Sequence, residues 1–367
     1  MTLTFPLRAG AVATGESDRA AILANPGFGK HFTDHMAVAR WTVAEGWHDA
    51  RIEPYGPLQI DPAAAVLHYA QEVFEGLKAY RHEDGSVWTF RPEANGERLQ
   101  HSAQRLALPP LPVEDFLTSL RALVAADQAW VPAYGTGETS LYLRPFMYAS
   151  EAFLGVRPSH EVTYAVIASP AGAYFSRGVT PVNLWVSTQY ARAGAGGTGA
   201  AKCGGNYASS LAGQLEGIQN HCDQAVFLDS ATHEYIEELG GMNLFLVYRD
   251  GRIVTPELTG SILPGVTRRS ILELAAEMGL TPQERRIAIQ EWKDGAASGE
   301  ITEIFACGTA AVITPVGELR WEGGSCDHRP AGAGDEMGEV TARLRSMLLD
   351  IQYGRVEDTR GWMTRLV

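Results

Sequence analysis

The most unusual part of the chain is a glycine-rich stretch around a single lysine. Residues 194–207 read GAGGTGAAKCGGNY, and the lysine is Lys202. A lysine amine is a useful nucleophile only where desolvation or neighbouring charge lowers its pKa. Glycines let a backbone and a ligand approach each other closely. The stretch therefore predicts a tight turn that brings a reactive amine to a cofactor, although a flexible surface loop explains this stretch alone equally well.

Nucleotide-binding motifs fit the same stretch poorly. Gly194, Gly196 and Gly199 match the dinucleotide pattern Gly-x-Gly-x-x-Gly, but a second glycine pair follows where a Rossmann loop would already have opened its helix. A phosphate-binding loop needs Gly-Lys followed by Ser or Thr. Here an alanine precedes the lysine and a cysteine follows it, so that motif is absent.

A second candidate for ligand binding is the start of a helix predicted over residues 266–278. Its apolar residues recur at helical spacing, and Gly279 follows as a natural C-cap. Free N–H groups at a helix start bind phosphate, and the helix macrodipole strengthens this binding. We therefore expect the backbone amides of Val266 and Thr267 to hold a phosphate group.

The elements that must position these residues are a mixture of hairpins and helices. Asp-Gly pairs lie inside the strand-like runs 79–90 and 244–254, and each predicts a β-hairpin because Asp-Gly tolerates the positive φ angles of a tight turn. Apolar periodicity predicts further helices over 113–126, 206–220 and 336–352. This mixture favours α/β or α+β domains over an all-parallel sheet.

The length of 367 residues predicts about two domains. Buried-strand patterns at 162–168 and 182–187 flank a stretch that contains proline and glycine, and this stretch is the best candidate for a boundary. We predict a small N-terminal α/β domain over 1–169, a linker over 170–181 and a large C-terminal domain over 182–367.

Composition disfavours several classes of function and location. The net charge of −13 argues against nucleic acid as a partner, because phosphate backbones demand a surplus of Lys and Arg. No apolar run approaches the roughly 20 residues of a membrane span, and the first residues lack a signal-peptide pattern. The chain has four cysteines without CxxC spacing, which predicts reduced thiols in a cytoplasmic protein and no metal site.

Eight blocks of sequence, in order, resemble branched-chain amino acid aminotransferases. These are fold-type-IV, class IV enzymes that depend on pyridoxal phosphate, and the stretch around Lys202 is similar to their cofactor-lysine segment. The other blocks are FGKHFTDHM at 28–36, FEGLKAY at 74–80, LYLRP at 141–145, ELGGMNLF at 238–245, LPGVTR at 263–268, GTAA at 308–311 and IQYG at 351–354. Because the blocks match in order over about residues 26–354, chance is negligible.

The resemblance implies two mixed α/β domains joined by a short interdomain loop, with pyridoxal 5'-phosphate bound mainly by the C-terminal one. It assigns Lys202 as the catalytic residue, which bonds to the cofactor aldehyde and then shuttles the substrate proton. Glu238 is expected to pair with the ring nitrogen, and Tyr207 to donate to the phenolic oxygen. The implied cofactor-binding residues are Lys202, Arg98, Tyr207, Glu238, Leu263, Val266, Thr267 and Thr309, with Arg98 and the Thr309 hydroxyl at the phosphate.

The implied reaction is transamination of L-leucine, L-isoleucine and L-valine with 2-oxoglutarate, by a homodimer. A pocket that distinguishes methyl groups discriminates by only about 1–3 kcal/mol per methylene, so all three amino acids are expected substrates. Val156 is expected to reach in from the neighbouring subunit, and Arg144 to help place the side-chain carboxylate of glutamate. The implied substrate-binding residues are Phe28, Tyr69, Phe74, Tyr142, Arg144, Val156, Tyr174, Gly241, Thr309 and Ala310, the last two through their backbone amides.

The chain departs from the family pattern at a few positions. Mammalian members carry a CxxC pair just after the Gly-Thr-Ala turn, where this chain has Ala311 and Thr314, so no dithiol switch is expected. Gly241 stands where some relatives have a threonine that contacts the cofactor ring.

Other functions remain open at this point. A D-amino-acid aminotransferase or an aminodeoxychorismate lyase would share the lysine and glutamate roles. Those enzymes are usually shorter and lack the blocks at 28–36 and 74–80. A non-catalytic pyridoxal-phosphate carrier is disfavoured because Lys202, Glu238 and Arg98 are all present together with Tyr207.

Overall fold

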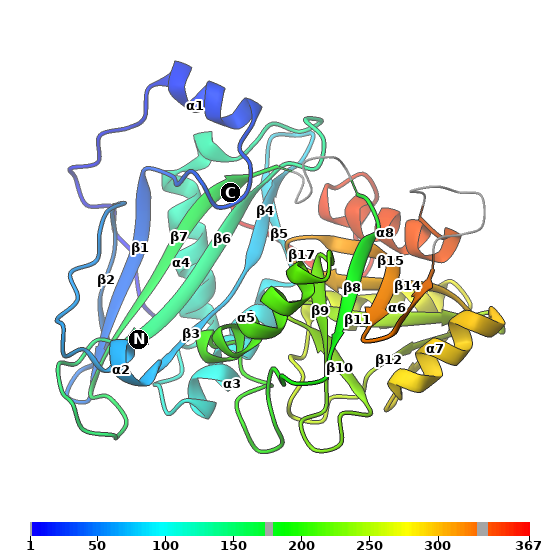
Figure 1. The fold of residues 1–367 in the computed structure, drawn as a ribbon. Coiled ribbons are helices and arrows are strands. Elements are labelled where there is room, and N and C mark those ends of the chain that lie inside the picture. Colours follow the sequence, from blue (N-terminus) through cyan, green and yellow to red (C-terminus); the bar gives the residue numbers. More distant parts are fainter. Residues whose placement is uncertain (1, 173–178, 329–336) are drawn as a thin grey trace. The chain divides into compact units, whose positions relative to one another are not determined.

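The chain forms two compact units in a computed structural model (Figure 1). The structure describes residues 2–172, 179–328 and 337–367. The first unit comprises Met1–Ser176, Ala201–Gly204 and Asp350–Val367, and the second comprises Arg177–Ala200 and Gly205–Leu349. The segment that carries Lys202 thus belongs to the first unit. The domain limits expected from the sequence, 1–169 and 182–367 with a linker over 170–181, stay a prediction.

The first unit is built on an antiparallel sheet. Among the described residues, its strands follow the order β17-β5-β4-β6-β7-β1-β2, and β3 pairs with β6. The strands are β1 (His35–Thr42), β2 (Gly46–Pro54), β3 (Glu72–Phe74), β4 (Leu77–Arg81), β5 (Val87–Phe90), β6 (Ser140–Ala149), β7 (Glu161–Ala171) and β17 (Met363–Arg365).

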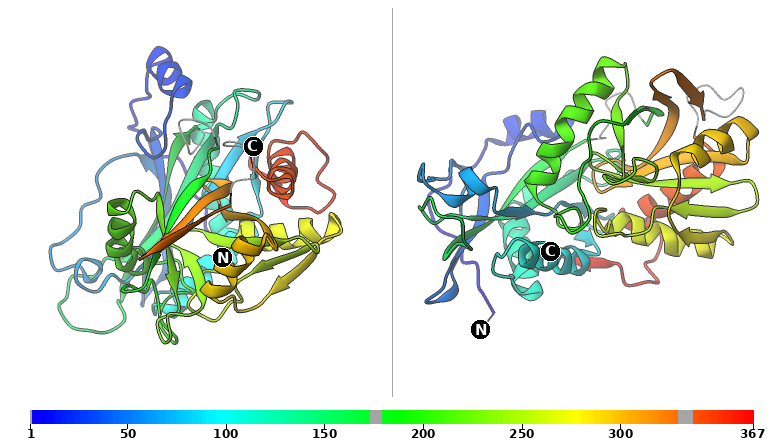
Figure 2. Two further views of the ribbon diagram at one scale, coloured as in Figure 1. Left: turned by 45° about the vertical axis from the view of Figure 1, so that its right-hand side comes forward. Right: turned by 60° about the horizontal axis from the view of Figure 1, so that its bottom comes forward.

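The first unit also contains α-helices, and one of them lies beside the strand that leads into residues 74–76. The helices are α1 (Glu16–Ala24), α2 (Ala65–Tyr69), α3 (Pro92–Arg105) and α4 (Val113–Ala126). The helix α4 packs against β1, β2 and β7, and α3 packs against both α4 and β3 (Figure 2). The helix α3 therefore lies beside the strand that leads into residues 74–76.

The second unit is built on a mixed sheet. Among the described residues, its order is β10-β9-β8-β15-β14-β11-β12-β13, and β16 pairs with β15. The strands are β8 (Val182–Ser187), β9 (Gln224–Leu228), β10 (Ile236–Leu239), β11 (Asn243–Tyr248), β12 (Arg252–Thr255), β13 (Thr281–Glu284), β14 (Ile301–Gly308), β15 (Val312–Trp321) and β16 (Gly324–Asp327). The helices are α5 (Gly204–Gln219), α6 (Val266–Glu277), α7 (Ile289–Ser298) and α8 (Glu339–Gln352).

The hairpins and helices predicted from the sequence are confirmed. The first Asp-Gly pair joins β4 to β5, and the second joins β11 to β12. Both turn glycines have positive φ, +85° at Gly85 and +88° at Gly251, a conformation that a glycine adopts without strain. The helix predicted over 113–126 is α4, and the one over 266–278 is α6. In the part of the chain that the structure describes, every helix is too short or too polar to cross a bilayer.

The helix α5 turns its apolar stripe outwards. Leu211, Leu215 and Ile218 have the helical spacing noted in the sequence, yet they are 64%, 55% and 62% exposed. The buried face is made of small and polar residues, among them Gly213 and Gly217. A Cβ at Gly213 would collide with the Phe227 ring on β9, so close packing of the helix requires glycine there.

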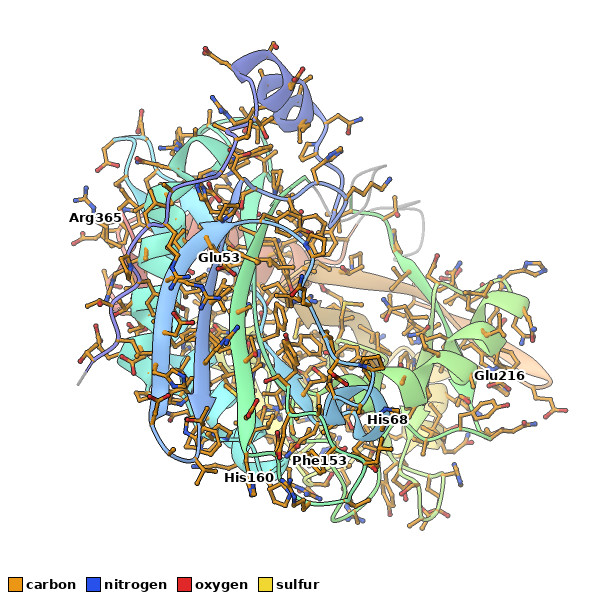
Figure 3. The ribbon with its side chains drawn as sticks, turned by 90° about the vertical axis from the view of Figure 1, so that its left-hand side faces the viewer. Glu53, His68, Phe153, His160, Glu216 and Arg365 are labelled. Atoms are coloured by element: carbon orange, nitrogen blue, oxygen red, sulfur yellow. The ribbon has the colours of Figure 1, made fainter. Side chains whose placement is uncertain are left out.

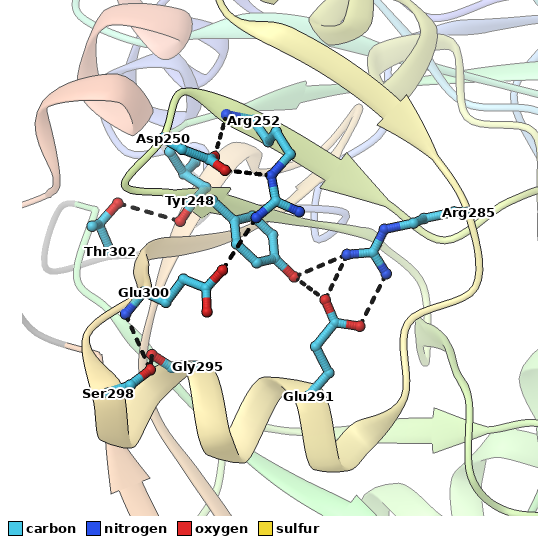
Figure 4. Close-up of polar contacts among 10 residues, drawn as sticks. Tyr248, Asp250, Arg252, Arg285, Glu291, Gly295, Ser298, Glu300 and Thr302 are labelled. Atoms are coloured by element: carbon cyan, nitrogen blue, oxygen red, sulfur yellow. Dashed lines mark hydrogen bonds and ion pairs between the residues drawn. The ribbon is translucent and has the colours of Figure 1, made fainter.

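A polar network ties α7 to the sheet of the second unit (Figure 4). The Tyr248 hydroxyl on β11 donates to the Glu291 carboxylate on α7. Arg285 donates to the same carboxylate from Nη1, at 2.9 Å, and from Nη2. These bonds, foremost those from Arg285, lower the pKa of Glu291. Burial, foremost, raises the pKa of Tyr248 to about 12.

We predict that Glu291→Gln destabilises the protein by about 0.5–1 kcal/mol at neutral pH, because the ion pair is only partly screened by water. The native pKa of Glu291 lies below its unfolded value, so its contribution is present above the unfolded value and is lost as the pH falls through the native one. Urea unfolding at neutral and acid pH should therefore show a difference from the parent protein that shrinks in acid. Glu322→Gln, at an exposed turn, is the control, and a difference independent of pH would contradict the account.

Candidate active site

Hydrogen bonds and buried neighbours attach the backbone around Lys202 to the first unit. Ala201 and Cys203 are each 2% exposed and belong to the core of that unit. The Lys202 N–H donates to the Ser102 hydroxyl on α3 at 2.9 Å, and its carbonyl accepts from the Phe74 N–H at 2.9 Å. The N–H of Gly204, two residues after the lysine, donates to the Glu72 carboxylate on β3. The backbone of Lys202 is therefore held on both sides by core residues of the first unit.

The Lys202 amine lies in an aromatic and charged environment. Its Nζ atom is 4.7 Å from the centre of the Phe74 ring. Burial, foremost, and then the positive charge of Arg98 lower its pKa to about 8, although the carboxylate of Glu75 acts in the opposite direction. At that pH about half of the amines are neutral, which is the nucleophilic form.

Arg98 is held by a buried carboxylate. Glu75 follows β3 and is fully buried, and Arg98 lies on α3 with 7% exposure. Arg98 donates from Nε to Glu75 Oε1 at 2.7 Å and from Nη2 to Oε2 at 2.8 Å. The same carboxylate accepts from Asn95 Nδ2 at 2.8 Å and from the Gly76 N–H at 3.2 Å. The predicted phosphate-binding arginine is therefore fixed in one orientation by a two-point ion pair.

Four of the predicted substrate-binding residues form one cluster beside Lys202. The rings of Phe28 and Tyr142 meet edge to face at 5.1 Å between centroids. The Arg144 guanidinium lies 4.8 Å from the centre of the Phe74 ring and donates to the Tyr142 hydroxyl at 3.1 Å. Such a cluster offers aromatic faces together with one positive group, which suits an aliphatic chain or a carboxylate.

The other predicted pocket residues of the first unit are exposed or lie outside the described residues. Tyr69, on α2, is 38% exposed and donates its hydroxyl to the Leu154 carbonyl. Val156 is 87% exposed. The segments that carry them are joined where the Phe153 N–H donates to the Ala63 carbonyl, and Figure 3 labels His68 and Phe153 of these segments. Tyr174 lies outside the described residues.

Glu238 lies on β10 in the second unit and is 2% exposed. The Arg192 guanidinium forms an ion pair with it, with 2.7 Å between Nη1 and Oε1. The Leu263 N–H also donates to Oε1, at 2.9 Å. A buried carboxylate of this kind must be compensated by positive or donor groups, and the pair provides that compensation.

The start of α6 has the geometry expected of an anion site. Gly265 precedes the helix in an extended conformation, and the first bond within the helix runs from the Arg269 N–H to the Gly265 carbonyl. The amides of Val266 and Thr267 therefore have no acceptor within the helix. A Cβ at Gly265 would collide with the Asn243 amide, so the close approach of β11 to this helix start requires glycine.

The remaining predicted residues of the second unit lie at the ends of elements. Tyr207 is half-buried in the first turn of α5, and a Cβ at Gly241 would lie in ordinary contact, 3.6 Å, with its ring. Thr309 and Ala310 form the half-buried turn between β14 and β15. Backbone amides in such turns can bind a carboxylate.

Sequence reasoning missed three polar residues that hold the predicted ones in place. These are Glu75 and Ser102 in the first unit and Arg192 in the second. Glu75 had a detectable signal, since it lies within the block FEGLKAY at 74–80 that carries the resemblance. Arg192 gave no signal, because nothing in the pattern before residue 194 distinguishes it from a surface arginine.

Comparison with known proteins shows the family. The model of the class IV amino-transferase family matches residues 72–319. The branched-chain-amino-acid aminotransferase of Mycolicibacterium smegmatis is 56% identical over 370 residues, which covers 99% of this chain and 98% of that protein.

Solved structures agree with the sequence comparison. The branched-chain amino acid aminotransferase of Escherichia coli superposes with a TM-score of 0.73 and 28% identity, over 90% of this chain and 100% of that one. The T.th. enzyme, solved with pyridoxamine 5'-phosphate, superposes with a TM-score of 0.71 and 30% identity, over 90% of this chain and 99% of that one. The predicted α/β fold of type IV is thereby confirmed. The chain belongs to the branched-chain-amino-acid aminotransferases of class IV.

Proposed function

We propose that this aminotransferase exchanges the amino group of L-leucine, L-isoleucine and L-valine with 2-oxoglutarate, as a cytoplasmic homodimer that uses pyridoxal 5'-phosphate. The observation that carries the proposal is the Lys202 amine, which lies 4.7 Å from the centre of the Phe74 ring and whose pKa is lowered to about 8 by burial, foremost, and by the charge of Arg98. The branched-chain-amino-acid aminotransferase of Mycolicibacterium smegmatis supports the class of amino acid. The similar enzyme solved with pyridoxamine 5'-phosphate supports the cofactor.

The residues present fit this cofactor chemically. Its aldehyde requires an amine that is partly neutral, and Lys202 provides one. Its phosphate requires positive charge and N–H donors, which Arg98 and the start of α6 supply together with the Thr309 hydroxyl. Its ring nitrogen requires a carboxylate, which we assign to Glu238, and the Leu263 N–H donates to that carboxylate. Its phenolic oxygen requires a hydrogen-bond donor, which we assign to Tyr207.

When bound, pyridoxal phosphate supplies an electron-withdrawing ring that stabilises negative charge at the substrate α-carbon. The protein supplies the proton transfers. Lys202 Nζ, once neutral, accepts the proton from the substrate α-carbon and delivers it to the carbon that was the cofactor aldehyde. Its backbone anchors at Ser102 and Phe74 restrict where that atom can reach. Arg192 compensates the buried charge of Glu238, the carboxylate assigned to the ring nitrogen.

The substrate is proposed to meet three kinds of group. The aliphatic side chain meets the aromatic faces of Phe28, Phe74 and Tyr142, with further contacts to Tyr69, to Gly241 and to Val156 of a second subunit. The Arg144 guanidinium, which already bonds to the Tyr142 hydroxyl, binds the side-chain carboxylate of glutamate. The amides of Thr309 and Ala310 bind the α-carboxylate. One pocket therefore serves an apolar substrate and an acidic one.

The direct test is Lys202→Ala. Transamination of L-leucine with 2-oxoglutarate should fall by several orders of magnitude, because both the amine that bonds to the cofactor and the proton carrier are removed. The purified variant should also lose the visible absorption band that L-leucine shifts in the parent protein. Lys293→Ala, on α7, is the matched control and should keep both. Survival of activity in Lys202→Ala, or a preference for D-amino acids in the parent protein, would refute the proposal.

We predict that Gly76→Ala damages the substrate pocket. A Cβ at Gly76 would overlap the Tyr142 hydroxyl, so Tyr142 must leave its place against Phe28 and Arg144. We expect a loss of about 1–3 kcal/mol in unfolding free energy and a rise of about tenfold in the KM for L-leucine. Gly56→Ala is the control, since a Cβ there has nothing within 4 Å. Unchanged kinetics in Gly76→Ala would show that Tyr142 does not line the pocket.

The exposed apolar stripe of α5 supports the proposed homodimer. Three large aliphatic side chains in a row on one helix face indicate a surface that another chain covers. We predict that Leu215→Arg shifts the protein from dimer towards monomer in sedimentation equilibrium, because the charge would be buried without a partner. Ala276→Arg adds the same charge to the exposed face of α6 and should leave the dimer intact. A dimer of equal stability in both variants would contradict this use of α5.

A further inference from the structure

Glu75 carries a buried negative charge that the stability of the fold alone does not require. It has no solvent exposure, and its two oxygens accept from Arg98, Asn95 and the Gly76 N–H. Removing a carboxylate and a guanidinium from water costs about as much as their attraction returns. An apolar pair of similar volume would stabilise the fold as well. The retained charges therefore point to a role in the site.

The first consequence of this geometry concerns the direction of the Arg98 side chain. Two of its three nitrogens, Nε and Nη2, donate to the two oxygens of Glu75 at 2.7 and 2.8 Å. A guanidinium is planar, so two parallel bonds fix its plane and the direction of the third nitrogen, Nη1. Arg98 thus faces any anion in one orientation, without the loss of side-chain freedom that a mobile arginine would suffer on binding.

The second consequence concerns charge around Lys202. The groups that act on its amine are Arg98 on α3, Arg144 and Tyr142 on β6, and Glu75 after β3. Arg98 and Arg144 both disfavour the protonated amine, and Glu75 is the carboxylate that opposes them. Without Glu75, two guanidinium groups would face the lysine, and its ammonium form would be far less stable.

We propose that Glu75 is a positioning residue that orients Arg98 through its two-point ion pair and supplies the negative charge that balances the two arginines around the Lys202 amine. The part of this inference that concerns phosphate rests on the proposed function, since it takes Arg98 as a partner of the cofactor phosphate. The part that concerns Lys202 does not depend on any cofactor.

Two substitutions separate charge from geometry. Glu75→Gln keeps the shape of the side chain and removes its charge. Glu75→Asp keeps the charge, but the side chain is one methylene shorter and cannot meet both nitrogens of Arg98 in the same place. Asp115→Asn is the matched control, because Asp115 is also a buried carboxylate of the first unit and bonds to the Leu3 N–H, away from the site.

The first measurement is the pH dependence of Lys202 acetylation by acetic anhydride, followed by peptide mass spectrometry, in the full chain freed of cofactor. The midpoint should lie near the pKa of about 8 in the parent protein. It should fall by roughly one unit in Glu75→Gln, because a negative neighbour is lost. It should stay near the parent value in Glu75→Asp and in Asp115→Asn. An unchanged midpoint in Glu75→Gln would overturn the charge-balancing role.

The second measurement compares the dissociation constants of pyridoxal phosphate and pyridoxal, because their ratio isolates the phosphate contacts. We expect Glu75→Asp to weaken pyridoxal phosphate about tenfold, the loss of one good charge-assisted contact, and to leave pyridoxal unchanged. An unchanged ratio would overturn the orienting role. If the parent protein binds neither compound, the proposed function fails, while the acetylation midpoints still decide the role of Glu75 at Lys202.

Discussion

Lys202 lies on the short segment Ala201–Gly204, which belongs to the first unit. Its two neighbours in sequence, Ala201 and Cys203, are buried in the core of that unit. Lys202 itself places its amine 4.7 Å from the centre of the Phe74 ring. Its backbone bonds to Ser102 and Phe74 then prevent the segment from turning over. Desolvation, foremost, lowers the pKa of this amine to about 8, so that a part of it is in the neutral, nucleophilic form near neutral pH.

Compensation of buried charge is a second principle, and each unit provides an example among its candidate residues. In the first, the buried carboxylate of Glu75 holds Arg98. In the second, Arg192 forms an ion pair with the buried Glu238. In each pair, one partner is a residue assigned a role by resemblance, and the other is a residue that holds it. Buried charges of this kind are expensive, so they persist where chemistry needs a charged group in a fixed direction.

Much of this architecture could be predicted from sequence, because the signals are local. The Asp-Gly pairs at Gly85 and Gly251 determine their own turns, and α4 and α6 follow from apolar spacing. The outward stripe of α5 could not be predicted, since periodicity identifies a helix but not which face is buried. Glu75 and Arg192 were missed because their partners are distant in sequence, 23 residues for Glu75 and Arg98. The resemblance assigned ligand-binding roles to particular groups, and the structure adds the groups that hold these side chains in place.

The amine of Lys202 is expected to carry the cofactor. Borohydride reduction of the purified holoenzyme, followed by peptide mapping, tests this expectation, because reduction makes the bond between amine and cofactor permanent. We expect one phosphopyridoxyl group per chain, on the peptide that contains Lys202. A stoichiometric label on a different lysine, such as Lys78, or no label on a protein that is active with L-leucine, would contradict it.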